Sequence, residues 1–272
     1  MSSYGIAATG LFTAEVWRRA GLDHAELFGT GIGRFMHACF RSFARATAPT
    51  LPDFLRQHDQ NLLWRHQTLT EWLVSRSPDI VVELACGYSP RGISLAKRMP
   101  PLQYYDTDLA HVIARKSSRM RTTTLPSNYH TQSLNALKPH TLQTILPNRE
   151  APAINTAAVI SEGLLLYLSP PQREALWKNV LEFLRRYTSG YYSFEIYLAN
   201  GFLEVGRAGR WYAKALGLLT GTDVLANLFV NVDAALAAIC AIGFTDARVI
   251  ATNKTSNGAA AQCAVLEAAY RG

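Results

Sequence analysis

The sequence predicts an α/β fold: a doubly wound, mostly parallel seven-stranded sheet, with a helical lid before it and a helical insertion before its last strands. Between residues 79 and 200, short apolar runs alternate with helical patterns, as in a parallel sheet that helices cover on both faces. The chain has 272 residues, of which 49% are hydrophobic and 17% charged, so it can bury a sizeable core.

The first 75 residues are expected to be helical and to form a lid together with the helices that lead into the sheet. Helices are predicted over residues 13–20, 25–28, 34–46 and 54–75. Thr13 has the character of an N-cap, and Pro49 and Pro52 separate the last two helices.

The rest of the chain supplies the sheet. Strands are predicted over residues 80–85, 102–107, 129–133, 157–161 and 191–198, and helices over 91–98, 110–121 and 171–187. Pro170 and Pro171 favour a helix start, because proline is tolerated in the first turn. After Asn200 the alternation stops and a helical pattern covers residues 201–228. Two strands, over 244–251 and 260–267, are expected to close the sheet as a β-hairpin.

A ligand-binding pattern follows the first predicted strand. The run from Val81 to Gly92 reads VVELACGYSPRG, in which Gly87 lets the backbone approach a ligand closely. Asp108 ends the second predicted strand, 21 positions after Gly87. A carboxylate at this spacing typically accepts hydrogen bonds from ribose hydroxyls, so the pattern predicts a nucleoside site.

The same turn lacks the G-x-G-x-x-G fingerprint that binds a dinucleotide pyrophosphate, because only Gly87 and Gly92 are present. S-adenosylmethionine is a nucleoside cofactor without phosphate, and its amino-acid tail needs one anionic and one cationic partner. Glu162, at the end of an apolar run, and Arg65, on a helical pattern before the first strand, are the candidates.

These motifs occur in the order seen in the leucine carboxyl methyltransferase family. The ordered set comprises Arg65, the turn from Glu83 to Arg91, Asp108-Leu109 with Lys116, the LNAL segment at 134–137 and the SEGLLLYL segment at 161–168. From about residue 10 to 268, the chain most resembles the bacterial branch that includes polyketide carboxyl O-methyltransferases of the tetracenomycin type. The resemblance implies a class I, Rossmann-like methyltransferase.

The resemblance implies roles for single residues. It places Arg65 on the methionine carboxylate, Glu162 near the amino group, and Asp108 on the ribose hydroxyls. The cofactor-binding residues that it predicts are Arg65, Glu83, Ala85, Gly87, Arg91, Asp108, Leu109, Leu134, Asn135, Ala136 and Glu162. Two positions depart from the family pattern, which often has Asp-Thr at Ser89-Pro90 and an acid at Asn135.

The resemblance also suggests how the chain divides. Residues 1–75 would be the helical lid, and residues 76–272 the S-adenosylmethionine-binding domain. A cap insertion at about 201–230 would lie over the substrate site.

Composition argues against several other classes. The net charge of +7 comes from dispersed Lys and Arg without aromatic interleaving, so no nucleic-acid partner is expected. No apolar run is a convincing membrane span and no secretion signal is visible. The four cysteines are scattered, so no metal site is predicted and a cytoplasmic location is expected.

The chemistry depends on the acceptor. A carboxylate, with a pKa of about 4, is already ionised at neutral pH, whereas a phenol, with a pKa of about 10, needs a general base. Neither His66 nor His111 lies at the end of a core strand, which favours carboxyl methylation. The candidate catalytic residues are Glu195, Tyr197 and Tyr167; Glu195 and Tyr197 share one strand face, and Tyr192 lies on the other.

The sequence thus favours an S-adenosylmethionine-dependent O-methyltransferase that esterifies a small-molecule carboxylate in specialised metabolism. Methylation of a phenol or enol is the alternative within enzymes, and would use Glu195 as base. A catalytically silent S-adenosylmethionine-binding protein is the alternative of another class. A nicotinamide-dependent reductase is disfavoured by the missing phosphate loop, and the GTGIG segment at 29–33 follows no strand, so it is expected to be a lid loop.

Overall fold

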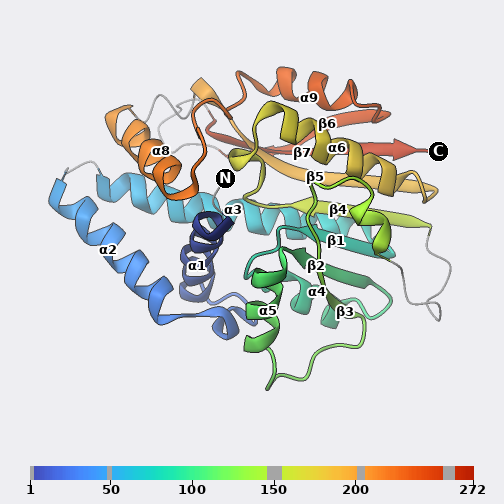
Figure 1. Ribbon diagram of the computed structural model, residues 1–272, viewed down its shortest axis with the longest axis horizontal. Helices are drawn as coiled ribbons and strands as arrows, with labels where there is room; N and C mark the ends of the chain where they lie inside the picture. The colour runs from blue at the N-terminus through green and yellow to red at the C-terminus, as the bar shows by residue number, and fades with distance from the viewer. Residues whose placement is uncertain (1–2, 48–50, 146–154, 201–205, 254–260) are drawn as a thin grey trace.

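The computed structural model describes residues 3–47, 51–145, 155–200, 206–253 and 261–272, in which seven strands form one sheet. Figure 1 shows this sheet with helices packed around it. The strands are β1 (Ile80–Leu84), β2 (Gln103–Asp108), β3 (Tyr129–Ser133), β4 (Thr156–Ser161), β5 (Ser189–Tyr197), β6 (Asp246–Thr252) and β7 (Cys263–Arg271). They follow the order β3-β2-β1-β4-β5-β7-β6. The first five run parallel, and β7 lies antiparallel between β5 and β6. The predicted fold class is confirmed.

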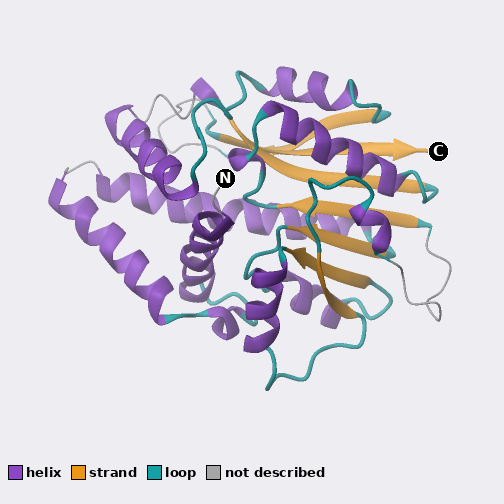
Figure 2. Ribbon diagram, viewed as in Figure 1, coloured by secondary structure: helices purple, strands orange, loops and turns teal. Residues whose placement is uncertain are grey.

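Helices dominate the chain before the sheet, as predicted. They are α1 (Ser3–Arg19), the 3-10 helix η1 (Ala25–Phe28), α2 (Gly31–Thr47) and α3 (Leu51–Arg76). Later elements are α4 (Arg91–Arg98), α5 (Ala110–Arg119), η2 (Thr141–Thr144), η3 (Leu165–Tyr167), α6 (Pro170–Leu184), α8 (Gly206–Thr220) and α9 (Val232–Cys240). In Figure 2, α1, α2 and α8 gather beyond one end of the strands. Over the described ranges, none of the helices combines the length and apolarity needed to cross a bilayer.

Two expectations about the lid were wrong. Thr13 is not an N-cap but lies inside α1, where its hydroxyl donates to the Thr9 carbonyl oxygen at 3.1 Å. The glycines at 31–33 are not a loop, because α2 begins at Gly31. The hydroxyl of Thr30 accepts from the Gly33 amide at 2.7 Å and so satisfies a backbone donor of the first helical turn.

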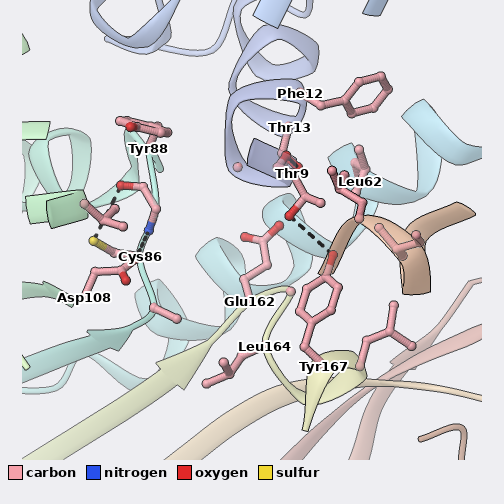
Figure 3. Close-up of a pocket in the computed structure, with 18 of the residues that line it drawn as sticks. Thr9, Phe12, Thr13, Leu62, Cys86, Tyr88, Asp108, Glu162, Leu164 and Tyr167 are labelled. Atoms are coloured by element: carbon pink, nitrogen blue, oxygen red, sulfur yellow. Dashed lines mark hydrogen bonds between the residues drawn. The ribbon is translucent and has the colours of Figure 1, made fainter. Parts of the chain in front are cut away.

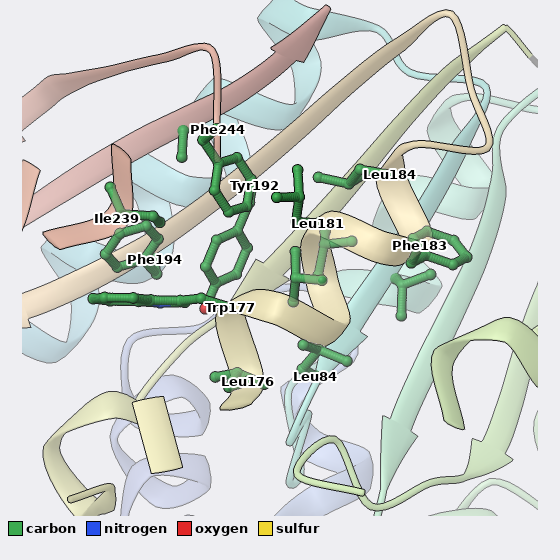
Figure 4. Packing of buried hydrophobic residues seen from close by; sticks show 14 of the residues in the cluster. Leu84, Leu176, Trp177, Leu181, Phe183, Leu184, Tyr192, Phe194, Ile239 and Phe244 are labelled. Carbon is green, nitrogen blue, oxygen red and sulfur yellow. The ribbon is translucent and has the colours of Figure 1, made fainter. Parts of the chain in front are cut away.

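Two apolar cores hold the layers together, one on each face of the sheet. One core packs α6 and α9 onto the sheet, and Figure 4 shows Trp177, Tyr192 and Phe194 meeting in it. The rings of Tyr192 and Phe194 stack with their centroids 4.7 Å apart. The opposite core joins Val81, Tyr104 and Ile160 to side chains of α1, α3 and α4. Helices on both faces explain why the central strands are apolar on both sides.

A buried ion pair ties α5 to the sheet. Lys116 Nζ lies 2.6 Å from Asp106 Oδ2, and neither side chain is exposed to solvent. Lys116 also donates to the Ser89 carbonyl oxygen at 2.8 Å, and the Tyr129 hydroxyl donates to Asp106 at 2.5 Å. The lysine therefore holds the loop after β1 against the carboxyl end of β2.

The sheet topology locates the site. The chain runs outward from β1 to β2 and β3, and then returns to β4 and β5 on the other side of β1. Ligands in open α/β sheets bind beyond the carboxyl ends of the strands where the order reverses. That point lies between β1 and β4.

We predict that Lys116→Met lowers the free energy of unfolding by about 3 to 5 kcal/mol, because it leaves the Asp106 carboxylate buried without its cation. Urea unfolding at pH 7 measures the change. Lys97→Met on exposed α4 surface is the matched control and should change stability little. Equal stability of the two variants would contradict this account of the ion pair.

Candidate functional site

A cavity of about 780 Å³ opens where the strand order reverses. Its floor is formed by residues that follow the carboxyl ends of β1 to β4, and by the end of β5. Its other walls come from α1, α2, α3 and α8. In the view of Figure 3, Cys86 and Asp108 lie at one end, Phe12 and Leu62 at the other, and Glu162 between them.

The turn after β1 is bent by two residues with positive φ, Ala85 at 51° and Gly87 at 50°. A left-handed backbone is uncommon for alanine, and such strain is typical of ligand sites. A Cβ added at Gly87 would meet no atom within 4 Å, so the space beside this backbone is open. Both residues, which were predicted to bind the cofactor, line the cavity.

Asp108 is fixed by two backbone amides. Its Oδ2 accepts from Gly87 at 2.9 Å, and its Oδ1 accepts from Leu109 at 2.7 Å. Burial raises the pKa of Asp108, although both amides oppose this shift. A carboxylate has about four lone-pair positions, so acceptor capacity is left for hydroxyl donors from the cavity.

The wall beside Asp108 is formed by Leu109, Leu134, Asn135 and Ala136, all predicted as cofactor-binding residues. Asn135 Oδ1 already accepts from the Leu137 amide at 3.1 Å. Its remaining acceptor capacity and its NH₂ group are what the side chain can offer a ligand.

Arg65 and Glu162, which were predicted to bind the two ends of the cofactor's amino-acid tail, contact each other at the middle of the cavity. Arg65 Nε donates to Glu162 Oε1 at 2.9 Å, although the two residues are 97 positions apart. Burial would lower the pKa of Arg65, but Tyr197, Glu162 and Glu195 raise it well above its ordinary value. Burial would likewise raise the pKa of Glu162, but Arg91, His66 and Arg65 hold it below the usual range. The pair is therefore fully ionised at neutral pH.

Glu83 and Arg91 were predicted to contact the cofactor, but neither lines the cavity. Arg91 Nη1 donates to Glu83 Oε1 at 2.7 Å, and Arg91 Nη2 donates to Glu162 Oε2 at 2.5 Å. Both side chains are buried beneath the turn, because each charge finds its partner there. Arg91 also donates to His66 Nδ1 at 2.8 Å, and burial lowers the pKa of this histidine. The turn thus rests on a buried ionic network.

Of the three predicted catalytic residues, Tyr167 and Tyr197 line the cavity and Glu195 does not. Glu195 lies behind the wall, where its Oε1 accepts from the Gly163 amide at 2.5 Å and lies 3.8 Å from Arg65 Nη1. The Tyr197 hydroxyl accepts from Arg65 Nη1 at 2.8 Å. Glu195 and Tyr197 therefore share a strand face, as predicted, while Tyr192 faces the other side of the sheet and packs in the core beneath α6 and α9.

Tyr167 is a poor candidate for a base. Its hydroxyl donates to the Thr9 hydroxyl at 3.4 Å, and burial raises its pKa. Figure 3 marks this bond between η3 and α1. The residue is better described as a contact that joins the lid to the floor of the cavity.

Sequence reasoning missed most of the helical wall. It includes Phe12 and Trp17 from α1, Phe35 and Phe40 from α2, and His58 and Asn61 from α3. One signal was present: His58, Asn61, Leu62 and Arg65 are spaced as one face of a helix.

Cys86 lines the cavity and is buried, which raises the pKa of its thiol well above the ordinary value. Within the described ranges, no three His, Cys, Asp or Glu side chains gather as they would around a metal ion.

The comparisons with known proteins agree with this geometry. Residues 57–181, which include most of the floor of the cavity, match the family model for leucine carboxyl methyltransferase. The resemblance predicted from the sequence is confirmed over this segment. A search of the curated proteins gave no significant match.

Solved structures share the fold at low sequence identity. An O-methyltransferase described as putative, from Nostoc punctiforme PCC 73102, is 16% identical with a TM-score of 0.54; the match covers 86% of this chain and 60% of that one. Human N-acetylserotonin methyltransferase, in complex with S-adenosylmethionine, is 11% identical with a TM-score of 0.53; the match covers 79% and 55%. This chain spans less than two thirds of the length of the first structures that it matches.

A third structure matches over nearly its whole length. Magnesium protoporphyrin IX methyltransferase from Synechocystis PCC 6803, with bound S-adenosylhomocysteine, is 16% identical with a TM-score of 0.52. The match covers 94% of this chain and 93% of that one. These likenesses confirm the class I methyltransferase fold.

We predict that Glu162→Gln lowers the free energy of unfolding at pH 7 by about 3 kcal/mol, because two buried guanidinium groups lose their shared carboxylate. The pKa of Glu162 is lower in the folded state, so its contribution is complete above the unfolded pKa of about 4.3 and is lost as pH falls. The difference between wild type and variant should therefore narrow between pH 7 and pH 3 in denaturant unfolding.

The matched control is Glu174→Gln, which removes an exposed carboxylate from a surface pair with Lys178. This variant should stay within about 0.5 kcal/mol of wild type at both pH values. A Glu162→Gln difference that does not shrink on acidification would contradict the assignment of its pKa.

Proposed function

We propose that this chain, whose residues 57–181 match the family model for leucine carboxyl methyltransferase, is a methyltransferase that esterifies a carboxylate of a small molecule in specialised metabolism. S-adenosylmethionine is the methyl donor. The observation that carries the proposal is the Asp108 carboxylate, held by the Gly87 and Leu109 amides at the point where the strand order reverses.

The side chains present fit this cofactor. Asp108 offers acceptors for the two ribose hydroxyls, beside the open backbone of Gly87. Leu134, Asn135 and Ala136 would flank the adenine. Arg65 and Glu162, which are ionised and adjacent, offer a cation and an anion to the carboxylate and ammonium of the methionine.

The chemistry asks little of the protein beyond alignment and exclusion of water. When bound, S-adenosylmethionine supplies an electrophilic methyl group that a carboxylate oxygen accepts, giving a methyl ester and S-adenosylhomocysteine. A carboxylate acceptor releases no proton, so the site needs no general base. The largely apolar walls of the cavity would desolvate the acceptor oxygen.

A phenol or enol acceptor is the second candidate, because burial raises the pKa of Glu195 to about 7, where a general base works best. Its position argues against that role. Glu195 does not line the cavity, and Arg65 and Gly163 engage the carboxyl oxygen that they face. Carboxyl methylation therefore remains the better proposal.

We predict that Asp108→Ala raises the Kd for S-adenosylhomocysteine by about 5- to 150-fold, the effect of losing buried hydroxyl contacts. Isothermal titration of the purified protein measures it. Asp246→Ala, at an exposed position of β6, is the matched control and should bind like wild type. Failure of folded wild-type protein to bind would overturn the proposed function; binding without turnover on any acid would favour the silent alternative.

The product distinguishes the two acceptor chemistries. With S-adenosylmethionine carrying a tritiated methyl group, incubation with a panel of aromatic and aliphatic acids should yield a product that releases volatile tritiated methanol in mild alkali. Methyl esters hydrolyse under these conditions, whereas aryl methyl ethers persist. A methylated product that resists alkali would show that the acceptor is a phenol or enol.

A further inference from the structure

The cavity is longer than the cofactor contacts require, and its far end is aromatic. Asp108 lies at one end, Glu162 at the middle, and Phe12 at the other end (Figure 3). The Phe12 ring lies 5.6 Å from that of Phe40, which comes from α2. If the nucleoside occupies the Asp108 end, the Phe12 end is left for the acceptor.

One face of α3 runs along this length. His58, Asn61 and Arg65 all line the cavity, at positions that share a helix face. At 1.5 Å of rise per residue, His58 lies about 10 Å along the helix from Arg65. The His58 ring is 5.8 Å from that of Phe12, which places it at the acceptor end.

His58 has a carboxylate beside it. Its Nδ1 lies 3.9 Å from Asp59 Oδ1, while Asp59 Oδ2 lies 3.2 Å from His37 Nε2 and 3.7 Å from Arg41 Nη1. Burial would raise the pKa of Asp59, but His58 and His37 hold it below its ordinary value. A carboxylate beside the ring restricts the orientation of the His58 imidazole.

We propose that His58, positioned by Asp59, is the acceptor-binding residue of the methyl transfer described above. It donates a hydrogen bond from its imidazole ring to an anionic oxygen of a flat aromatic acid that packs against Phe12 and Phe40. This inference rests on the proposed function, and it adds the residue that selects the acceptor and the kind of acid selected.

The route into the cavity agrees with an apolar acceptor. Phe35 of α2 and Leu219 of α8 line the cavity, yet their exposed fractions are 69% and 44%. They therefore stand at its mouth, where an aromatic acid can pass between two apolar helix faces. Arg65, a second basic side chain that lines the cavity, is engaged by Glu162 and Tyr197 nearer the middle of the cavity.

The test measures binding, so it does not depend on turnover. Naphthalene-2-carboxylate and the neutral analogue 2-naphthol are titrated into protein saturated with S-adenosylhomocysteine, for wild type, His58→Phe, His58→Gln and Asp59→Asn. The control is His140→Phe, because His140 is exposed and lies outside the cavity. Binding of S-adenosylhomocysteine itself is measured on every variant as the check of folding.

We expect wild type to bind naphthalene-2-carboxylate more tightly than 2-naphthol. His58→Phe and His58→Gln should each raise the Kd of the carboxylate at least about tenfold, as expected for a hydrogen bond to a charged group, without changing the Kd for S-adenosylhomocysteine. Asp59→Asn should act in the same direction with a smaller effect, and His140→Phe should have none.

Three results would overturn the inference while leaving the proposed function intact, provided that S-adenosylhomocysteine binds normally. These are no binding of naphthalene-2-carboxylate to wild type, equal binding by wild type and both His58 variants, or a loss confined to 2-naphthol. Failure of wild type to bind S-adenosylhomocysteine would instead contradict the proposed function.

Discussion

The site depends on a buried ionic network in which two guanidinium groups meet three carboxyl groups. Arg91 pairs with Glu83 and Glu162, and Arg65 pairs with Glu162 and lies near Glu195. Guanidinium groups stay charged in any protein environment, so their burial is tolerable only with carboxylates in contact. The network joins α3 to β1, α4, β4 and β5, so the helix that closes the cavity is fixed by charge as well as by packing.

The number of guanidinium groups near each carboxyl group explains why their pKa values differ. Glu162 contacts both arginines and has a lowered pKa. Glu195 lies 3.8 Å from Arg65 alone, and Arg65 also pairs with Glu162. Burial therefore dominates at Glu195 and raises its pKa to about 7. A titrating carboxyl group beside a binding site is often a sign of catalysis. In this network the raised pKa of Glu195 has a structural cause: three carboxyl groups share two guanidinium groups, so one carboxyl group has no cation of its own.

The backbone around the network is shaped for a ligand on one side and for the charges on the other. Gly163 has φ of 71°, and a Cβ at this position would lie 3.1 Å from Arg65 Nη2. Glycine there lets the guanidinium group pass beneath the turn after β4, while the Gly163 amide binds Glu195. The turns after β1 and β4 therefore carry left-handed residues for different reasons: the first opens space, and the second admits a side chain.

The sequence predicted the sheet and the strand-end residues well, because both follow from local patterns. A strand that ends in a glycine turn, followed by a strand that ends in Asp108, places the carboxylate beside Gly87 in any parallel pair. It could not separate residues that line the cavity from residues one layer below, such as Glu83, Arg91 and Glu195. That distinction depends on ion pairs between distant parts of the chain. Glu162, for example, pairs with Arg91 across 71 positions and with Arg65 across 97, and no local pattern encodes these contacts.

The sequence did not predict the helical wall of the cavity, because its residues form no recognisable motif. They come together only through the way in which α1 and α2 pack against each other. The aromatic cluster of Phe12, His37, Phe40 and His58 draws on three helices. The strand side of the cavity is consequently polar, and its residues follow local sequence patterns. The helical side is aromatic, and its residues are brought together by tertiary packing. The proposed methyl transfer needs both halves, since the donor must be held by fixed charges and the acceptor oxygen must be stripped of water. Changes on the helical side can then alter the acceptor without disturbing the ionic network that holds the strand side.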